Sequence, residues 1–456
     1  MSLLKFESML KTNAIYFFDL VEFEEIIIHY LDAGKHALAK KAVKLGLQQH
    51  PASVDLKLLQ VEIYIFENEL DKAYLLLNII ERLQPNNDEV FIQKATINSK
   101  KRNHKEAIVL LKKALTFTDE KLDIWSLLGM EYLYLDDFKN ARLTFIKCIA
   151  EDYEDYAALY NVVYCFDMEE EHKEAISYLN EYVNINPYCE VAWHQLGRQY
   201  FILKKYKEAL KAFDYAVLID ESFIGGYLEK AKTLEELGRY KEAIDNYLIT
   251  LELDDATAYV YIRIGECHEK LEHYDEAISF YKMAVHEDPL LDKGWGLLTN
   301  LYYQHENYPK AAYCNTKALK IEEDNAVYWK RYTEINLKLN FYEEAVTGFK
   351  KCLGLNDNSL ETYIGLIDVF SFLGEFNNAL NILIKAQKLH KNSAEIEYRL
   401  AGLFLILNKE KYGLNHLIAA LKIDYDYNTI LNKLYPSVYD TEKVQNLLSN
   451  YKKTME

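Results

Sequence analysis

The sequence repeats itself every 34 residues. The stretch WSLLGMEY at residues 125–132 returns as WHQLGRQY at residues 193–200, 68 positions later, with Trp, Leu, Gly and Tyr at the same internal spacing. Because 68 is twice 34, units can be started at residue 20 and at every 34th residue after it, which gives twelve units without insertion or deletion. A fixed period of this length is typical of chains that stack one supersecondary unit on the next.

The twentieth position of each unit is the most uniform column. It holds alanine in eleven units and glycine in the last: Ala39, Ala73, Ala107, Ala141, Ala175, Ala209, Ala243, Ala277, Ala311, Ala345, Ala379 and Gly413. Positions 4, 7, 8 and 11 lie on one stripe of a first helix, and positions 20, 24 and 27 lie on one stripe of a second. A small side chain is needed where two helices approach most closely. The pattern therefore predicts a helix hairpin in every unit.

Turn residues support this division. Gly34, Gly238 and Gly374 fall at position 15, between the two helices, where a left-handed backbone conformation is useful. Four of the six prolines fall at position 32, where they stop one unit before the next begins: Pro51, Pro85, Pro187 and Pro289.

One unit carries an almost complete family pattern, W-x2-L-G-x2-Y followed by Ala, an aromatic residue and Ala. Its residues are Trp193, Leu196, Gly197, Tyr200, Ala209, Phe213 and Ala216. The chain thus resembles the tetratricopeptide-repeat (TPR) family over residues 20–427. The resemblance implies an all-α fold, a right-handed α-α superhelical solenoid of TPR helix hairpins whose first helices line a concave groove. Because the end repeats need cover, we expect terminal capping helices in residues 1–19 and residues 428–456.

Composition and charge narrow the function. A formal net charge of −18 argues against non-specific binding to nucleic acid or to an anionic membrane surface. No apolar run approaches the roughly 20 residues of a membrane helix, and we expect no membrane insertion. The N-terminal stretch carries charges throughout and predicts no secretory signal. Six scattered cysteines without a CxxC pair favour a reducing, cytoplasmic location.

The sequence contains no catalytic or cofactor motif. It lacks the glycine-rich loops that bind phosphates. In HEKLEH (268–273), His268 and His273 are five residues apart, so they do not share the helix face that a zinc-binding HExxH helix requires. About 20–30 residues lie outside the array at each end, which is far below the size of a domain. We therefore expect a chain that is not an enzyme and that has neither a cofactor nor a bound metal.

The candidate site is a surface. Positions 2, 5, 9 and 12 of the first helices form a second stripe, here called the groove stripe, which faces the groove implied by the family. Its N-terminal half is partly apolar, and its C-terminal half carries a polar ladder. The predicted partner-binding residues are Tyr160, Tyr164, His194, Arg198, Lys232, Arg263, Glu266, Asn300, Lys330 and Glu334. Aromatic and arginine residues are common anchors of protein contacts, so we expect a segment of a partner protein to bind there.

Two alternatives stay open. The polar ladder is also compatible with a solvated face whose charges compensate one another, with Arg198 and Lys232 beside Glu266, and Lys330 beside Glu334. The chain is also compatible with a structural subunit of a multiprotein assembly that uses its convex faces or ends, including self-association.

Overall fold

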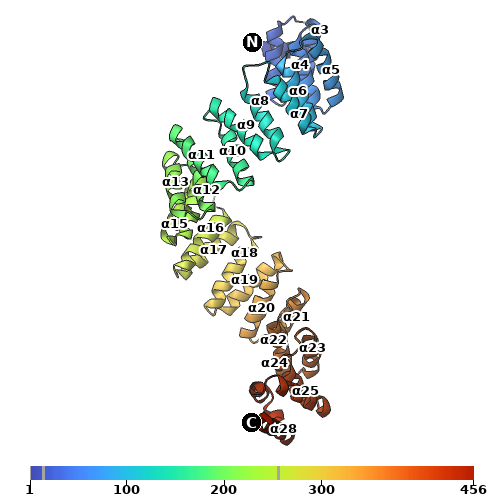
Figure 1. Ribbon diagram of the computed structural model, residues 1–456, viewed down its shortest axis with the longest axis vertical. Coiled ribbons are helices and arrows are strands. Elements are labelled where there is room, and N and C mark those ends of the chain that lie inside the picture. The colour runs from blue at the N-terminus through green and yellow to red at the C-terminus, as the bar shows by residue number, and fades with distance from the viewer. Residues whose placement is uncertain (1, 13–15, 254–256, 456) are drawn as a thin grey trace. The chain divides into compact units, whose positions relative to one another are not determined.

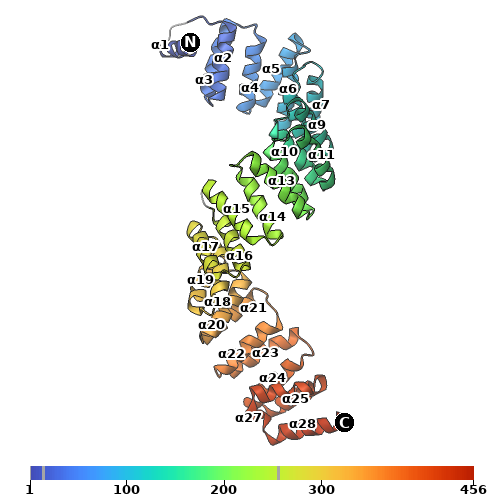
Figure 2. The same ribbon diagram turned by 90° about the vertical axis from the view of Figure 1, so that its left-hand side faces the viewer.

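The computed structural model describes residues 2–12, 16–253 and 257–455. Every regular element in these ranges is helical. The chain divides into two compact units, Met1–Thr233 and Leu234–Glu456, and each is described by itself. Within each unit, helix hairpins follow one another in chain order (Figures 1 and 2). The expectation of an all-α solenoid of helix hairpins is confirmed.

The first unit begins with α1 (Ser2–Thr12), and six hairpins follow. Their first helices are α2 (Leu20–Asp32), α4 (Val54–Phe66), α6 (Asp88–Lys100), α8 (Leu122–Leu133), α10 (Tyr156–Met168) and α12 (Glu190–Ile202). Their second helices are α3 (His36–Gln49), α5 (Leu70–Leu83), α7 (His104–Ala114), α9 (Phe138–Glu151), α11 (His172–Ile185) and α13 (Tyr206–Ile219). The next helix, α14 (Ile224–Glu236), contains the boundary between the units.

The second unit contains the remaining hairpins and a terminal segment. After α14, the first helices are α16 (Ala258–Lys270), α18 (Asp292–Gln304), α20 (Ala326–Lys338), α22 (Leu360–Phe372) and α24 (Ala394–Ile406). The second helices are α15 (Tyr240–Leu253), α17 (Tyr274–Glu287), α19 (Tyr308–Ile321), α21 (Tyr342–Gly354), α23 (Phe376–Leu389) and α25 (Glu410–Ile423). A 3-10 turn (Asp426–Asn428), α26 (Thr429–Leu434), α27 (Pro436–Tyr439) and α28 (Glu442–Met455) follow.

The helix starts follow the 34-residue spacing. Every first helix begins at position 1 of a 34-residue repeat, and every second helix begins at position 17. The eleven alanines of position 20 are all 0% exposed, which agrees with their expected place at the closest helix approach. Tryptophans at position 4 also link successive repeats by hydrogen bonds. Trp193 donates its indole N–H to the carbonyl of Pro187 at 2.9 Å, and Trp295 donates to the carbonyl of Pro289 at 3.1 Å.

Both terminal segments add buried side chains to the array. In α1, Phe6 and Met9 are buried, and the Phe6 ring lies edge-on to Phe23 with 6.4 Å between the centroids. Residues 1 and 13–15 of the expected N-terminal cap, and residue 456 of the C-terminal one, lie outside the described residues. Near the C-terminus, the ring of Tyr435 lies directly against Gly402 of α24 and leaves no room for a Cβ there. The terminal segment therefore occupies the groove stripe of the last repeat.

Candidate functional site

Tyr160 and Tyr164 lie one turn apart on α10 and expose 44% and 47% of their surface. Residues four apart in a helix share one face, so the two rings form one aromatic patch. The ring of Phe138 lies edge-on to Tyr164 with 6.3 Å between the centroids. Exposed tyrosines that are held on a rigid helix offer a large contact area to a partner at little entropic cost.

His194 of α12 is partly buried, although the sequence placed it in the polar ladder. Its ring packs against Phe213 and Phe223 with centroid distances of 5.7 and 5.1 Å. Both ring nitrogens are inaccessible and have no hydrogen-bond partner among the described residues. Burial lowers the pKa of His194 to about 4, so the ring is neutral at physiological pH.

Two of the predicted partner-binding residues in the first unit are cations, and both have partners on their own helices. Arg198 donates from Nη1 to Gln195 Oε1 at 3.2 Å on the same helix. Lys232 of α14 donates to Glu229 Oε1 at 2.8 Å, also within its own helix. The structure thus pairs Lys232 with Glu229, whereas the solvated-face alternative placed it beside Glu266.

Arg263 and Glu266 belong to a network that joins successive first helices of the second unit. Arg263 donates to Glu235 of α14 at 2.5 Å and to Glu266 at 2.7 Å. Glu266 also pairs with Lys293 of α18 at 2.8 Å. Tyr247 donates its hydroxyl to Glu235 at 2.5 Å, and burial, followed by this hydrogen bond, raises the pKa of Tyr247. Positive and negative groups alternate along the network, which compensates much of their charge.

Three residues of this network were not predicted from the sequence: Glu235, Lys293 and Tyr247. Glu235 and Lys293 stand at positions 12 and 2, which belong to the groove stripe, so reading all four columns together would have found them. Tyr247 stands at position 24, where the sequence indicates only core packing.

Asn300, Lys330 and Glu334 lie further along the second unit. Asn300 is exposed on α18. Lys330 donates to Glu361 of α22 at 3.1 Å, and Glu334 accepts from Arg331 at 2.7 Å. Lys330, which the solvated-face alternative placed beside Glu334, thus forms a pair that crosses to the next repeat, and Glu334 forms a pair within α20.

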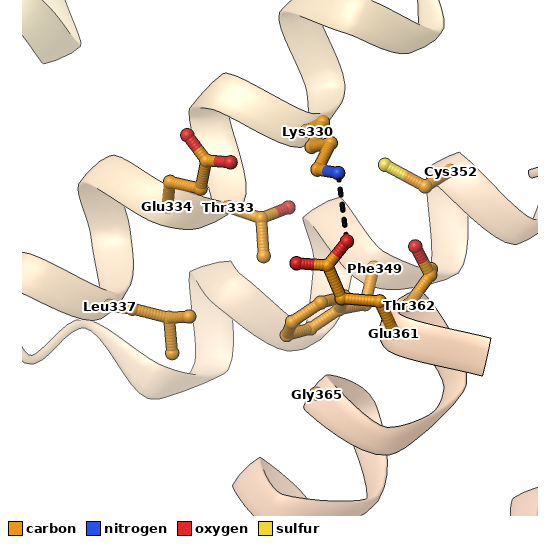
Figure 3. Close-up of a pocket in the computed structure, with 9 residues that line it drawn as sticks. All are labelled: Lys330, Thr333, Glu334, Leu337, Phe349, Cys352, Glu361, Thr362 and Gly365. Atoms are coloured by element: carbon orange, nitrogen blue, oxygen red, sulfur yellow. Dashed lines mark hydrogen bonds and ion pairs between the residues drawn. The ribbon is translucent and has the colours of Figure 1, made fainter. Parts of the chain in front are cut away.

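Lys330 and Glu334 also line a pocket that opens on the groove stripe between α20 and α22 (Figure 3). Its volume is about 200 Å³, and most of its lining is apolar. The lining residues are Lys330, Thr333, Glu334, Leu337, Phe349, Cys352, Glu361, Thr362 and Gly365. Figure 3 shows the Lys330–Glu361 pair beside the ring of Phe349. The sequence carried one signal for this pocket, since Gly365 is the only glycine at position 6 of any 34-residue repeat.

The described residues contain no group of three or more His, Cys, Asp or Glu side chains that could hold a metal ion. No helix in these ranges is long and apolar enough to cross a membrane. All six cysteines are buried and unpaired.

Two family models match the chain. A model described as tetratricopeptide repeat matches residues 126–188 and 228–291, and a second model with the same description matches residues 191–223. Among curated proteins, the chain is 23% identical over 180 residues to anaphase-promoting complex subunit 3 of Schizosaccharomyces pombe. The match covers 40% of this chain but only 27% of that protein, so most of the relative's length lies outside it.

The chain is also similar to solved structures. The C-terminal part of a TPR repeat-containing protein from Cytophaga hutchinsonii is 17% identical and matches 51% of this chain and 95% of its own, with a TM-score of 0.44. A MamA fragment from Desulfovibrio magneticus is 23% identical, with coverages of 37% and 96% and a TM-score of 0.35. The APC/C hetero-tetramer Cut9–Hcn1 is 14% identical, with coverages of 88% and 92% and a TM-score of 0.34.

Proposed function

This chain is a tetratricopeptide-repeat protein, and we propose that it is a non-enzymatic scaffold that binds a segment of a partner protein along its groove stripe. The observation that carries the proposal is the stripe itself, which offers the exposed rings of Tyr160 and Tyr164 in one unit and an open apolar pocket in the other. Exposed aromatic groups and small apolar pockets with polar rims are the features on which protein recognition concentrates.

The same proposal includes the wider setting of the chain. The array comprises an N-terminal cap in residues 1–19, twelve repeats in residues 20–427 and a C-terminal cap in residues 428–456. The chain acts in the cytoplasm, without cofactor or metal, and it does not bind nucleic acid. The net charge of −18 supports the last point, since nucleic-acid binding draws on clustered positive charge.

A second candidate function is that of a structural subunit in a multiprotein assembly. The similarity to a subunit of the anaphase-promoting complex favours it, although most of that protein lies outside the match. Apolar side chains outside the groove stripe are also available, because Tyr215 and Leu218 of α13 expose 50% and 73% of their surface. Contacts of this kind would use the second helices and would include self-association.

Affinity capture with two matched double variants separates these functions. Tyr160→Ala with Tyr164→Ala removes the aromatic patch of the groove stripe, whereas Tyr215→Ala with Leu218→Ala removes comparable apolar surface from a second helix. We expect the first variant to lose at least nine-tenths of a captured partner and the second to retain it, with circular dichroism showing that both are folded. Loss only in the second variant would refute groove binding and favour the assembly subunit.

A further inference from the structure

The pocket between α20 and α22 arises from a packing exception in the tenth repeat. Position 24 is buried in the other eleven repeats, but Phe349 is only partly buried. In the fourth, sixth and eighth repeats, an aromatic ring at position 24 lies over a glycine at position 8. These pairs are Phe145 on Gly129, Phe213 on Gly197 and Tyr281 on Gly265.

The tenth repeat cannot pack its ring in this way. Position 8 is Thr333, whose side chain lies against Gly348 of α21 and occupies the space that a glycine would leave open. The ring of Phe349 instead lies against Gly365 of α22, where it leaves no room for a Cβ. The ring thus becomes part of the pocket lining, to which Leu337 also belongs (Figure 3).

The chain fills the corresponding place one repeat further on with its own side chain. Tyr435 lies against Gly402 of α24, and its neighbours include Asp368 and Ser371 of α22 and Arg399 of α24. Asp368 and Ser371 stand at positions 9 and 12 of one first helix, and Arg399 stands at position 6 of the next.

The pocket between α20 and α22 uses the same three positions, which hold Glu334, Leu337 and Gly365. The place between α22 and α24 that Tyr435 fills, here called the seat, therefore has an open counterpart between α20 and α22. A volume of about 200 Å³ is below the range of about 300–1,000 Å³ that is usual for small-molecule sites, and it suits one side chain.

The differences between the two seats indicate which side chain the open one accepts. Ser371 and Arg399, the polar groups beside Tyr435, are replaced by Leu337 and Gly365. Ser371 bonds the hydroxyl of Tyr435, and the apolar Leu337 at the corresponding position removes this partner, so the open seat favours phenylalanine over tyrosine. Each of the two rim carboxylates already has a cation, since Glu334 accepts from Arg331 at 2.7 Å and Glu361 accepts from Lys330 at 3.1 Å. The net charge of −18 of the whole chain is what favours a basic neighbour for the inserted ring.

We propose that the pocket at Gly365 receives a phenylalanine side chain from a partner protein's segment, with a lysine or arginine within two residues of it. The proposal rests on the proposed function, because it names the anchor residue of a segment that binds the groove stripe. Lys330 and Glu361 hold the rim in place, and the ring of Phe349 stacks against the inserted side chain.

Panning of the full-length protein against a phage-displayed library of random dodecapeptides tests the anchor directly. We expect enriched peptides to share a phenylalanine with a nearby lysine or arginine. In fluorescence anisotropy with the most enriched peptide, Phe→Ala in the peptide should weaken binding at least tenfold, and Phe→Tyr should weaken it less. Enrichment of peptides without phenylalanine would overturn the proposal, as would enrichment of the chain's own LYPSVY (434–439), which would indicate a second copy as the occupant.

Two protein variants place the peptide in the pocket. Gly365→Ala adds a methyl group that pushes the Phe349 ring into the space, and Leu337→Glu puts a carboxylate on its wall. Gly354→Ala is the matched control, because a Cβ there meets nothing within 4 Å and the residue lies outside the pocket. We expect a loss of binding of at least tenfold in the first two variants and less than twofold in the control. Equal binding to Gly365→Ala and Gly354→Ala, both folded by circular dichroism, would overturn the proposal.

The results also separate this proposal from the proposed function. If Tyr160→Ala with Tyr164→Ala abolishes capture of a partner while Gly365→Ala does not affect peptide or partner, groove binding stands and the anchor assignment fails. If neither variant affects a captured partner but the peptide binds as described, the pocket stands and the proposed partner site fails.

Discussion

The six cysteines show how burial sets the chemistry of single side chains in this protein. All are buried, between 0% and 4% exposed. Burial raises the thiol pKa to about 11 for Cys148, Cys165, Cys314 and Cys352, and to about 12 for Cys267. It also raises the pKa of Cys189. Since the thiolate is the reactive form, these groups are both hidden and protonated at neutral pH.

We therefore predict that the native protein reacts very slowly with the thiol reagent DTNB. At pH 8, labelling of the folded chain should be at least a hundredfold slower than that of the chain in 6 M guanidinium chloride, in which six thiols should react. Rapid reaction of any thiol in the native state would show that its helix pair opens often.

His194 gives a prediction about pH. The unfolded chain takes up a proton on this ring below about pH 6.5, whereas burial lowers the folded pKa to about 4. Between these values the unfolded state binds more protons, so stability falls as the pH falls, by at most about 1.4 kcal/mol per pH unit. Glu229 opposes the shift, and Arg198 and Lys232 add to it.

The substitution His194→Gln removes this titration. We expect urea midpoints measured between pH 6.5 and pH 4 to decline less steeply for the variant than for the wild type. Parallel declines would mean that His194 titrates alike in the folded and unfolded chains.

At the scale of the helix hairpin, the turn between the two helices has one conformation throughout. Position 15 has a positive φ in all twelve repeats, between 55° and 75°. The sequence predicted this for Gly34, Gly238 and Gly374, where glycine is its signal. The other nine positions carry side chains, and these could not be recognised from residue type: Asn68, Arg102, Asp136, Glu170, Lys204, Glu272, Glu306, Asn340 and Asn408.

A glycine at such a site should relieve strain. We predict that Glu272→Gly stabilises the α16–α17 hairpin by up to about 1 kcal/mol, whereas Gly374→Ala destabilises the α22–α23 hairpin by about 1 kcal/mol or more. Hydrogen exchange of the amides in each hairpin measures the local change. The same direction of change in both variants would contradict the strain argument.

The contrast between helices and site at this scale has a physical cause. The helix hairpins could be predicted because position 20 and the turn each act within one hairpin, as Ala243 and Gly238 illustrate. The pocket could not, because it depends on how Phe349 of one repeat meets Gly365 of the next. The charge pairs could not be predicted for a similar reason, since Lys330 pairs with Glu361 across repeats while Glu334 pairs within its own helix.

At the scale of the whole molecule, the helices in contact are close to one another in chain order within each unit. In a chain whose repeats contact only their neighbours, the free energy of unfolding is a sum of contributions from single repeats and their interfaces. Such a chain need not unfold in one step. The four tryptophans report on this, because Trp125 and Trp193 lie in the first unit and Trp295 and Trp329 in the second.

We predict that the two units lose structure at different urea concentrations. Tryptophan fluorescence of a Trp295→Phe with Trp329→Phe variant should give a midpoint different from that of a Trp125→Phe with Trp193→Phe variant. Circular dichroism of each should give a broader transition that spans both midpoints. A single coincident transition for all probes would instead show that the chain unfolds cooperatively as a whole.

The unbroken 34-residue spacing also governs which changes in length the protein can survive. Duplication of any 34 consecutive residues within the array, wherever it begins, returns the next alanine of position 20 and the next turn of position 15 to their places. An insertion of one residue within a helix instead rotates every following side chain of that helix by about 100° and turns its apolar stripe away from its neighbours. The chain can therefore lengthen or shorten by recombination in whole repeats, whereas intermediate lengths are not accessible to it.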